Sequence, residues 1–191
     1  MIVNLTPMKK TSSGFTLVEL LVVVAIAAVL ISLAVPSFTS MMMRRSVQST
    51  ALTLVSDLRY TRTEALRRSA RVSICSLANN STSVCSGSPA RWVNGWMIFV
   101  DTGATTGVLD AGEEIIRVQQ APENILSIQR DTTPANTRNV LTFEANGFAR
   151  TADETLVVIP TQSASTTVNR VICISRGGRP ALRVEGATGC T

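Results

Sequence analysis

Glu19 is the residue whose position most needs a chemical explanation, because it interrupts an apolar run that reaches from Phe15 to Val35. A carboxylate in a membrane-spanning segment is costly and needs a partner. Cleavage between Gly14 and Phe15 would create an α-amino group, with an ordinary pKa of about 8, close to Glu19 in the sequence. The spacing therefore predicts an ion pair between a new amino terminus and the Glu19 carboxylate.

The apolar run itself has the length of a membrane span. Residues 15–35 form a helix of about 31 Å at 1.5 Å per residue, and a bilayer core is about 30 Å thick. The preceding leader, residues 1–14, is polar and contains Lys9 and Lys10. These positive charges place the leader in the cytoplasm and the rest of the chain outside it. Either Met1 or Met8 could be the true start.

A secretory signal peptide is the alternative interpretation of this segment. It would have a small-residue cleavage site after the apolar run, whereas this run ends Leu33-Ala34-Val35-Pro36, without an Ala-x-Ala pattern. The segment Gly14-Phe15-Thr16-Leu17-Val18-Glu19-Leu20 instead resembles the processing site of type IV pilins and type II secretion pseudopilins. The resemblance implies that a prepilin peptidase removes residues 1–14 and methylates Phe15. It also implies that Glu19 pairs with the amine of a neighbouring subunit.

Residues 36–70 continue the helix with a different surface. Pro36 interrupts the hydrogen-bond ladder but is not expected to end the helix. Beyond it, apolar residues recur at roughly helical spacing at Val47, Ala51, Leu54, Val55, Leu58, Ala65 and Leu66. The opposite face carries Arg44, Arg45, Arg59, Arg62, Arg67 and Arg68. We expect one helix from Phe15 to about Ser69, whose second half is an amphipathic spine.

Residues 71–191 change to short runs that are typical of strands. Eight strands are expected at Arg71–Leu77, Trp92–Val100, Glu114–Gln119, Ile125–Gln129, Val140–Phe143, Thr155–Ile159, Arg170–Ser175 and Leu182–Val184. The predicted class is α+β: the pilin fold, with a long helix packed against an antiparallel β-sheet domain.

Four cysteines lie in this domain, at positions 75, 85, 173 and 190. Outside the cytoplasm they are expected to form disulfides. Of the three possible connectivities, pairing neighbours in sequence closes the shortest loops and is favoured: Cys75 with Cys85 and Cys173 with Cys190. Zinc ligation would require closer spacing and usually histidine, which the chain lacks.

The segment Trp92-x-x-Gly95-Trp96-x-x-Phe99-x-Asp101 is similar to that of GspH/FimT-type minor pilins and pseudopilins. Physically, both tryptophans are expected to pack in the core rather than to stack on a ligand.

Arg176, Arg179 and Arg183 lie on a Gly/Pro-shaped turn and could present guanidinium groups to phosphates. The turn looks like the Gly-Arg-x-Arg element with which FimT-type minor pilins contact DNA. Here the next arginine after Arg179 is Arg183, two positions later than that pattern requires. A solvated turn or a contact between filament subunits is the alternative interpretation.

The remaining candidate site is the acidic segment from Asp101 to Glu114, where Asp110, Glu113 and Glu114 could converge on calcium. A glycine-rich connection with solvated acids is favoured, because the alternate positions after Asp101 hold Gly103 and Thr105. Without histidine, no nucleophile–base pair is recognisable. We therefore expect no enzyme activity, no cofactor and no metal.

Taken together, these features predict a minor pilin or pseudopilin that acts in the assembly or priming of a type IV pilus-like filament. The chain would be anchored once in the bacterial inner membrane, with its globular domain in the periplasm. Its expected partners are other pilins or pseudopilins and the prepilin peptidase. A type II secretion pseudopilin and a pilus-tip DNA-binding subunit remain the alternatives.

Overall fold

A computed structural model describes residues 14–79, 81, 83–87, 89–130, 139–151, 154–161, 168–187 and 189–190, without the side chains of 33–37, 89–91 and 130. The predicted leader lies outside these residues apart from Gly14. The chain divides into two compact units, Met1–Ser40 and Met41–Thr191. Each unit is described separately below.

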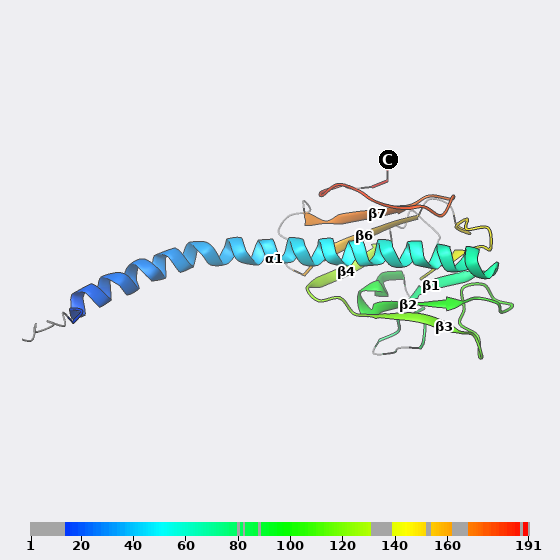
Figure 1. Cartoon of the computed structure of the whole chain (residues 1–191), viewed down its shortest axis with the longest axis horizontal. Coiled ribbons are helices and arrows are strands. Elements are labelled where there is room, and N and C mark those ends of the chain that lie inside the picture. Colours follow the sequence, from blue (N-terminus) through cyan, green and yellow to red (C-terminus); the bar gives the residue numbers. More distant parts are fainter. Residues whose placement is uncertain are drawn as a thin grey trace, which may run out of the picture. The chain divides into compact units, whose positions relative to one another are not determined.

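Helix α1 covers Leu17–Arg68, which agrees with the prediction to within two residues at each end (Figure 1). Its carboxyl end closes with Ser69 in a left-handed conformation, at φ 50°. The Ala70 N–H donates to the Ala65 carbonyl at 3.3 Å, and the Ser69 N–H donates to the Leu66 carbonyl at 3.4 Å. These two bonds satisfy carbonyls that the helix end would otherwise leave unpaired.

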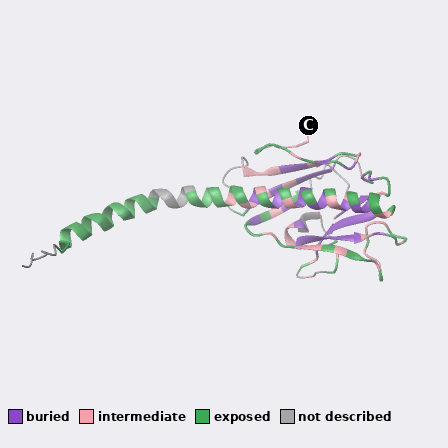
Figure 2. Ribbon diagram, in the orientation of Figure 1, coloured by how far each residue is buried: buried purple, intermediate pink, exposed green. Residues whose placement is uncertain are grey.

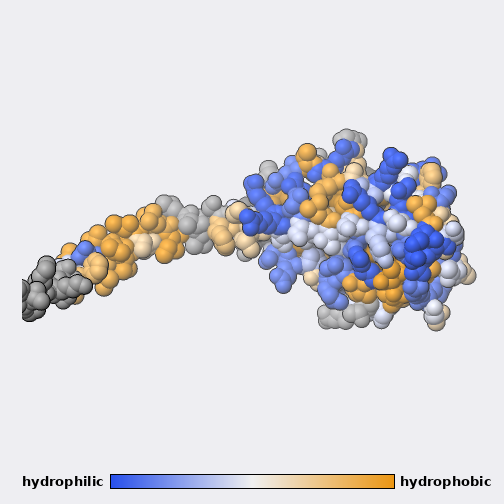
Figure 3. All heavy atoms as spheres, viewed as in Figure 1, coloured by the Kyte–Doolittle hydropathy of each residue, from blue (hydrophilic) through white to orange (hydrophobic). Residues whose placement is uncertain are grey.

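The first unit contains the amino-terminal part of α1, whose described side chains are all exposed. Figure 3 shows that hydrophobic residues dominate this surface. Among the described residues, no helix combines the length and the apolar character needed to cross a membrane. The predicted span at 15–35 includes residues 33–35, whose side chains lie outside the described part.

In the second unit, one face of α1 is buried in the core and the other is exposed (Figure 2). The buried face contains Val47, Ala51, Leu54, Val55, Leu58 and Ala65, as the helical spacing predicts. Leu66 was expected on the same face but is 44% exposed, so that part of the prediction is wrong. It covers the turn at Gly147, where an added Cβ would meet its side chain at 3.1 Å.

Within the described residues, eight strands form two four-stranded antiparallel sheets, in the orders β3-β2-β1-β5 and β4-β6-β7-β8. Their bounds are β1 Val72–Ser76, β2 Gly95–Val100, β3 Ile115–Gln120, β4 Ile125–Arg130, β5 Val140–Phe143, β6 Glu154–Pro160, β7 Arg170–Ile174 and β8 Pro180–Leu182. Figure 1 shows the strands of both sheets beside the carboxyl-terminal half of α1.

Two predicted strands differ from the structure. The first three residues of the predicted strand Trp92–Val100 belong to a 3₁₀ helix, Pro89–Asn94, and β2 begins only at Gly95. Gly95 has φ 99°, which ends the 3₁₀ turn in a conformation that favours glycine. The last strand lies at Pro180–Leu182 rather than Leu182–Val184. Proline is tolerated there because β8 is an edge strand.

The main core lies between α1 and the two sheets and includes both tryptophans. Trp92 is 0% exposed and Trp96 is 1% exposed, so their predicted packing role is confirmed. The Trp96 indole N–H also donates to the Asp57 carboxylate at 2.8 Å, while Arg117 pairs with the other Asp57 oxygen at 2.7 Å. A buried carboxylate satisfied in this way joins α1 to β2 and β3.

Each disulfide connects two cysteines that follow one another in the sequence, as predicted from the short loops that this pairing closes. Cys75 bonds to Cys85 and Cys173 bonds to Cys190, with S–S distances of 2.10 and 2.05 Å. The first bond joins β1 to the loop that precedes the 3₁₀ helix. The second attaches the carboxyl-terminal segment to β7.

An ion-pair network covers the carboxyl end of α1. Glu64 is 5% exposed and accepts hydrogen bonds from Arg67 and Arg68, while Arg68 also forms two bonds to Glu114. The bonds from Arg67 and then Arg68 lower the pKa of Glu64 from 4.5 to about 2. Its ionised form is therefore stabilised by folding.

We predict an acid-sensitive contribution of Glu64 to stability. Because folding lowers its pKa, this contribution is complete above about pH 4.5 and is lost as the pH falls through about 2. Thermal unfolding of Glu64→Gln should show a smaller decrease in Tm between these values than the wild type. The part of the free energy of unfolding that the wild type loses over this pH range, and that Glu64→Gln does not, should be about 1 kcal/mol. It is small because the Arg67 side chain is 62% exposed and water screens the ion pair. Glu123→Gln, at an exposed glutamate, is the control, and an unchanged profile for Glu64→Gln would contradict the prediction.

Candidate processing and assembly site

The predicted cleavage site precedes the helix in the first unit. Gly14, Phe15 and Thr16 are not helical, and Phe15 is 85% exposed. A Cβ added at Gly14 would meet no described atom within 4 Å. The fold of the described chain therefore gives no steric reason for glycine at this position.

Thr16 is the N-cap of α1. Its hydroxyl oxygen accepts the Glu19 backbone N–H at 3.2 Å, and its carbonyl accepts the Leu20 N–H at 3.2 Å. The Thr-x-x-Glu spacing is that of a capping box, of which the threonine half is formed here. Because this bond uses the backbone of Glu19, its carboxylate does not contribute to it.

The Glu19 carboxylate is exposed in the first turn of α1. The helix dipole favours a negative charge at this end. Within the described residues, no cation forms an ion pair with it. Among the described residues, the site therefore combines a non-helical peptide bond before Phe15, with no described atom close to a Cβ added at Gly14, and an exposed carboxylate without an ion-pair partner.

The three arginines of the predicted anion-binding turn do not form one cluster. Arg179 and Arg183 line an open pocket of about 500 Å³ beside the Cys173–Cys190 disulfide. They flank Ala181, which pairs with Cys173, and the two-residue period of a strand places 179, 181 and 183 on one face. The unusual spacing thus still directs Arg179 and Arg183 to the same side.

Arg176 lies on the preceding turn and does not line this pocket. The turn closes with a bond from the Gly178 N–H to the Ser175 carbonyl at 2.8 Å. Gly178 has φ 72°, and a Cβ there would collide with the Gly147 carbonyl at 2.1 Å. Arg62 of α1 donates to that carbonyl at 2.9 Å, so the neighbouring turn at Gly147 is held against the helix. Sequence spacing gave no sign of this contact.

The acidic segment is held together by its own backbone. Glu113 accepts the N–H groups of Thr102, Gly103 and Asp110 at 2.7, 2.7 and 2.9 Å. Burial would raise the pKa of Glu113, but these backbone bonds outweigh it and lower the pKa.

Of the other acids in this segment, Asp110 is bound to Glu113 in both directions through its backbone, and Asp101 and Glu114 have partners elsewhere. Asp101 accepts Ser73 and the Gly107 N–H, and Glu114 binds Arg68. Within the part of the chain that the structure describes, no group of three or more acidic or cysteine residues could hold a metal ion.

Comparison with protein families assigns the class. The fold and the amino-terminal motif are those of minor pilins and pseudopilins, which are structural filament subunits and not enzymes. The family "Type II transport protein GspH" matches residues 50–178, and the "Prokaryotic N-terminal methylation motif" matches residues 9–35. The chain belongs to the GspH family. Proteins with this motif are membrane-anchored and incorporated into filaments. No curated protein matches the chain significantly in sequence.

The solved structures of one minor pilin show the same fold. The type IV minor pilin FimU of Pseudomonas aeruginosa aligns with a TM-score of 0.55 and 23% identity, over 78% of this chain and 97% of FimU. A second crystal form of FimU gives 0.53 and 23%, over 75% and 99%. The minor pseudopilin EpsH from the type 2 secretion system of Vibrio cholerae gives 0.48 and 9%, over 73% and 97%. The FimU similarity confirms the predicted pilin fold.

Proposed function

We propose that this protein is a minor subunit of a type IV pilus-like filament that matures by cleavage between Gly14 and Phe15. A prepilin peptidase removes residues 1–14 and methylates the new amine of Phe15. The proposal rests on the surroundings of the peptide bond between Gly14 and Phe15. The peptide bond is non-helical, and no described atom lies within 4 Å of a Cβ added at Gly14. Glu19, in the first turn of the adjoining helix, has no ion-pair partner among the described residues.

The proposed mechanism is assembly. Residues 15–35 hold the subunit in the bacterial inner membrane, and residues 71–191 form the globular domain in the periplasm. On extraction, Glu19 neutralises the amine of a neighbouring subunit while the helices pack. This ion pair would favour assembly, because either charge alone is costly in the apolar environment between the helices. As a minor subunit, the protein would act in assembly or in priming the filament.

In-cell cross-linking of the epitope-tagged full chain, followed by mass spectrometry, tests the filament assignment. Recovery of a major pilin with other minor pilins would support the pilus. Recovery of pseudopilins would instead assign the protein to type II secretion, which uses the same processing and assembly chemistry. Failure to recover either would contradict the proposal.

DNA binding at a pilus tip is a second candidate function, because Arg179 and Arg183, which lie immediately before and after β8, line the same pocket. Arg183 already donates to the Cys190 carbonyl at 2.7 Å, so its guanidinium is held in place. Arginine forks in this arrangement could contact successive phosphates of a nucleic acid. The buried Glu154 also lines the pocket and would oppose an anion that entered deeply.

We predict that the full chain in neutral detergent binds duplex DNA with strong salt dependence. Arg179→Gln together with Arg183→Gln should weaken DNA binding about tenfold or more at low salt. The slope of log K against log salt concentration should become shallower by about 2, because each phosphate contact contributes about 0.9 to it. Arg59→Gln, at an exposed arginine of α1, is the matched control. If the wild type does not bind at low salt, the DNA function is excluded.

A further inference from the structure

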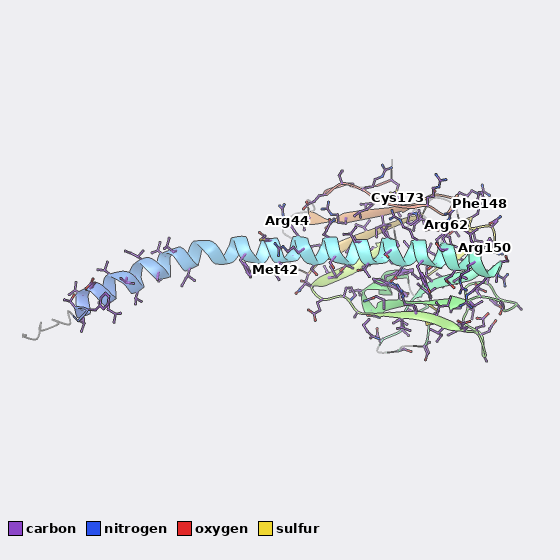
Figure 4. The ribbon with its side chains drawn as sticks, viewed as in Figure 1. Met42, Arg44, Arg62, Phe148, Arg150 and Cys173 are labelled. Atoms are coloured by element: carbon purple, nitrogen blue, oxygen red, sulfur yellow. A yellow bond between two sulfur atoms is a disulfide. The ribbon has the colours of Figure 1, made fainter. Side chains whose placement is uncertain are left out.

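Three arginines from distant parts of the chain converge on one pocket in the second unit. Arg44 and Arg45 lie on α1, and Arg170 is the first residue of β7. They line an open pocket of about 520 Å³ with Gln48, Ser49 and Leu52. Figure 4 shows Arg44 on α1 near the start of β7. None of the functions described above uses this pocket.

The charges around the pocket are not balanced. Among the described residues, Glu185 is the one carboxylate that pairs with these arginines, with Arg44 at 3.6 Å and with Arg170 at 3.4 Å, both long distances for an ion pair. Arg45 forms no ion pair with a described residue. Three guanidinium groups therefore face one carboxylate, and the pocket keeps an excess of positive charge. Such an excess favours an anionic ligand.

Arg170 is also held in place for binding. Its Nε donates to the Gln48 side-chain oxygen at 2.7 Å, and its side chain is only 18% exposed. Each guanidinium has five N–H donors, so most remain available after these contacts. A planar fork of donors that is fixed in advance matches the oxygens of a phosphate group and loses little entropy on binding. The chemistry of the pocket therefore points to a phosphate.

The sequence around Arg44 favours a lipid over a soluble phosphate. The segment between Val35 and Arg44 has no charged residue, and it ends with three methionines, Met41 to Met43, immediately before Arg44. Phe38 is 63% exposed, and Met41 and Met42 are each 48% exposed. Basic residues that directly follow exposed apolar residues next to a membrane anchor are placed to meet anionic headgroups.

We propose that Arg44, Arg45 and Arg170 bind the headgroup phosphate of an anionic phospholipid. The inference rests on the proposed anchoring of residues 15–35 in the inner membrane. The bound headgroup would hold the globular unit at the membrane surface before assembly, and extraction into a filament would release it. Glu185 competes with the phosphate for the same arginines and limits the affinity.

The test uses the full chain in neutral detergent micelles that contain either phosphatidylglycerol or phosphatidylcholine, with bound lipid counted by native mass spectrometry. The wild type should retain phosphatidylglycerol and not phosphatidylcholine. Arg45→Gln should weaken retention about fivefold, and Arg44→Gln with Arg45→Gln about twentyfold, since each arginine near an anionic lipid is worth about 1 kcal/mol. Glu185→Gln should strengthen retention several-fold. Arg59→Gln, on the same helix, should change nothing.

Three outcomes would overturn the proposal. These are equal retention of both lipids, unchanged retention in the double arginine variant, and competition by inorganic phosphate at the same concentration as the lipid. The last outcome would assign the pocket to a soluble phosphate. Leader cleavage and filament incorporation in cells are measured separately and do not depend on this pocket. Failure of the lipid proposal therefore leaves the proposed function unchanged.

Discussion

Valine at position 14 should leave the leader attached to the protein. In Gly14→Val, cleavage before Phe15 should fall at least about tenfold, which corresponds to about 1.4 kcal/mol or more of lost transition-state stabilisation. The reason is that the peptidase must accommodate the side chain of the residue before the cleaved bond. The chain itself does not explain the effect, because no described atom lies within 4 Å of a Cβ added at Gly14. The two forms separate on a denaturing gel of cell membranes.

Gly14→Ala provides the graded control, because it adds a single methyl group and should be cleaved to an intermediate extent. Both variants should accumulate to wild-type levels, since position 14 has no contact that the fold requires. Full cleavage of Gly14→Val would contradict the assignment of the processing site. Loss of the protein altogether would show that glycine serves the fold.

Glu19→Ala should be processed and inserted normally but should enter filaments at least about tenfold less efficiently than the wild type. Removing the carboxylate leaves the neighbouring amine unpaired in the helix bundle, and breaking a buried pair in this way typically costs about 3–5 kcal/mol. The substitution should leave the start of α1 intact, because Thr16 caps the backbone N–H of residue 19. The measurement is the ratio of tagged protein in sheared filaments to that in membranes.

Thr16→Ala is the matched control for this experiment. It removes the helix cap, worth about 1 kcal/mol, but keeps the carboxylate. If the Glu19 charge is required, Glu19→Ala should be incorporated into filaments much less efficiently than Thr16→Ala. Normal incorporation of Glu19→Ala would remove Glu19 from the assembly mechanism.

The sequence predicted most of the fold because its signals are local. Helix α1 follows from apolar residues at helical spacing, and the strands follow from short β-rich runs between turns. The disulfides follow from loop length, since the partners are 10 and 17 residues apart. These features depend on residues that are close in sequence.

The errors and omissions involve contacts between distant residues. Leu66 has the spacing of the buried face, yet it is partly exposed over the turn at Gly147. The hydrogen bond from Arg62 to the Gly147 carbonyl, beside the Gly178 turn, joins residues that no local pattern relates. The division of the strands into two sheets likewise depends on long-range pairing, which periodicity does not encode.

In the candidate site, Gly14, Phe15 and Glu19 were singled out because their spacing is a local motif, which the methylation-motif family also matches. Their roles in processing and assembly stay predictions. The pocket between Arg44 and Arg170 was missed, because its two sides are brought together only by the packing of β7 against α1. Arg176 was grouped with Arg179 and Arg183, although a turn directs it elsewhere and only the latter two line one pocket.

The most direct test of the central claim is mass spectrometry of the amino-terminal peptide of the tagged protein in purified filaments. The expected peptide begins at Phe15 and carries one N-methyl group, which would establish processing and incorporation in the same sample. A protein that is absent from the filaments, or that retains residues before Phe15 within them, would contradict the account.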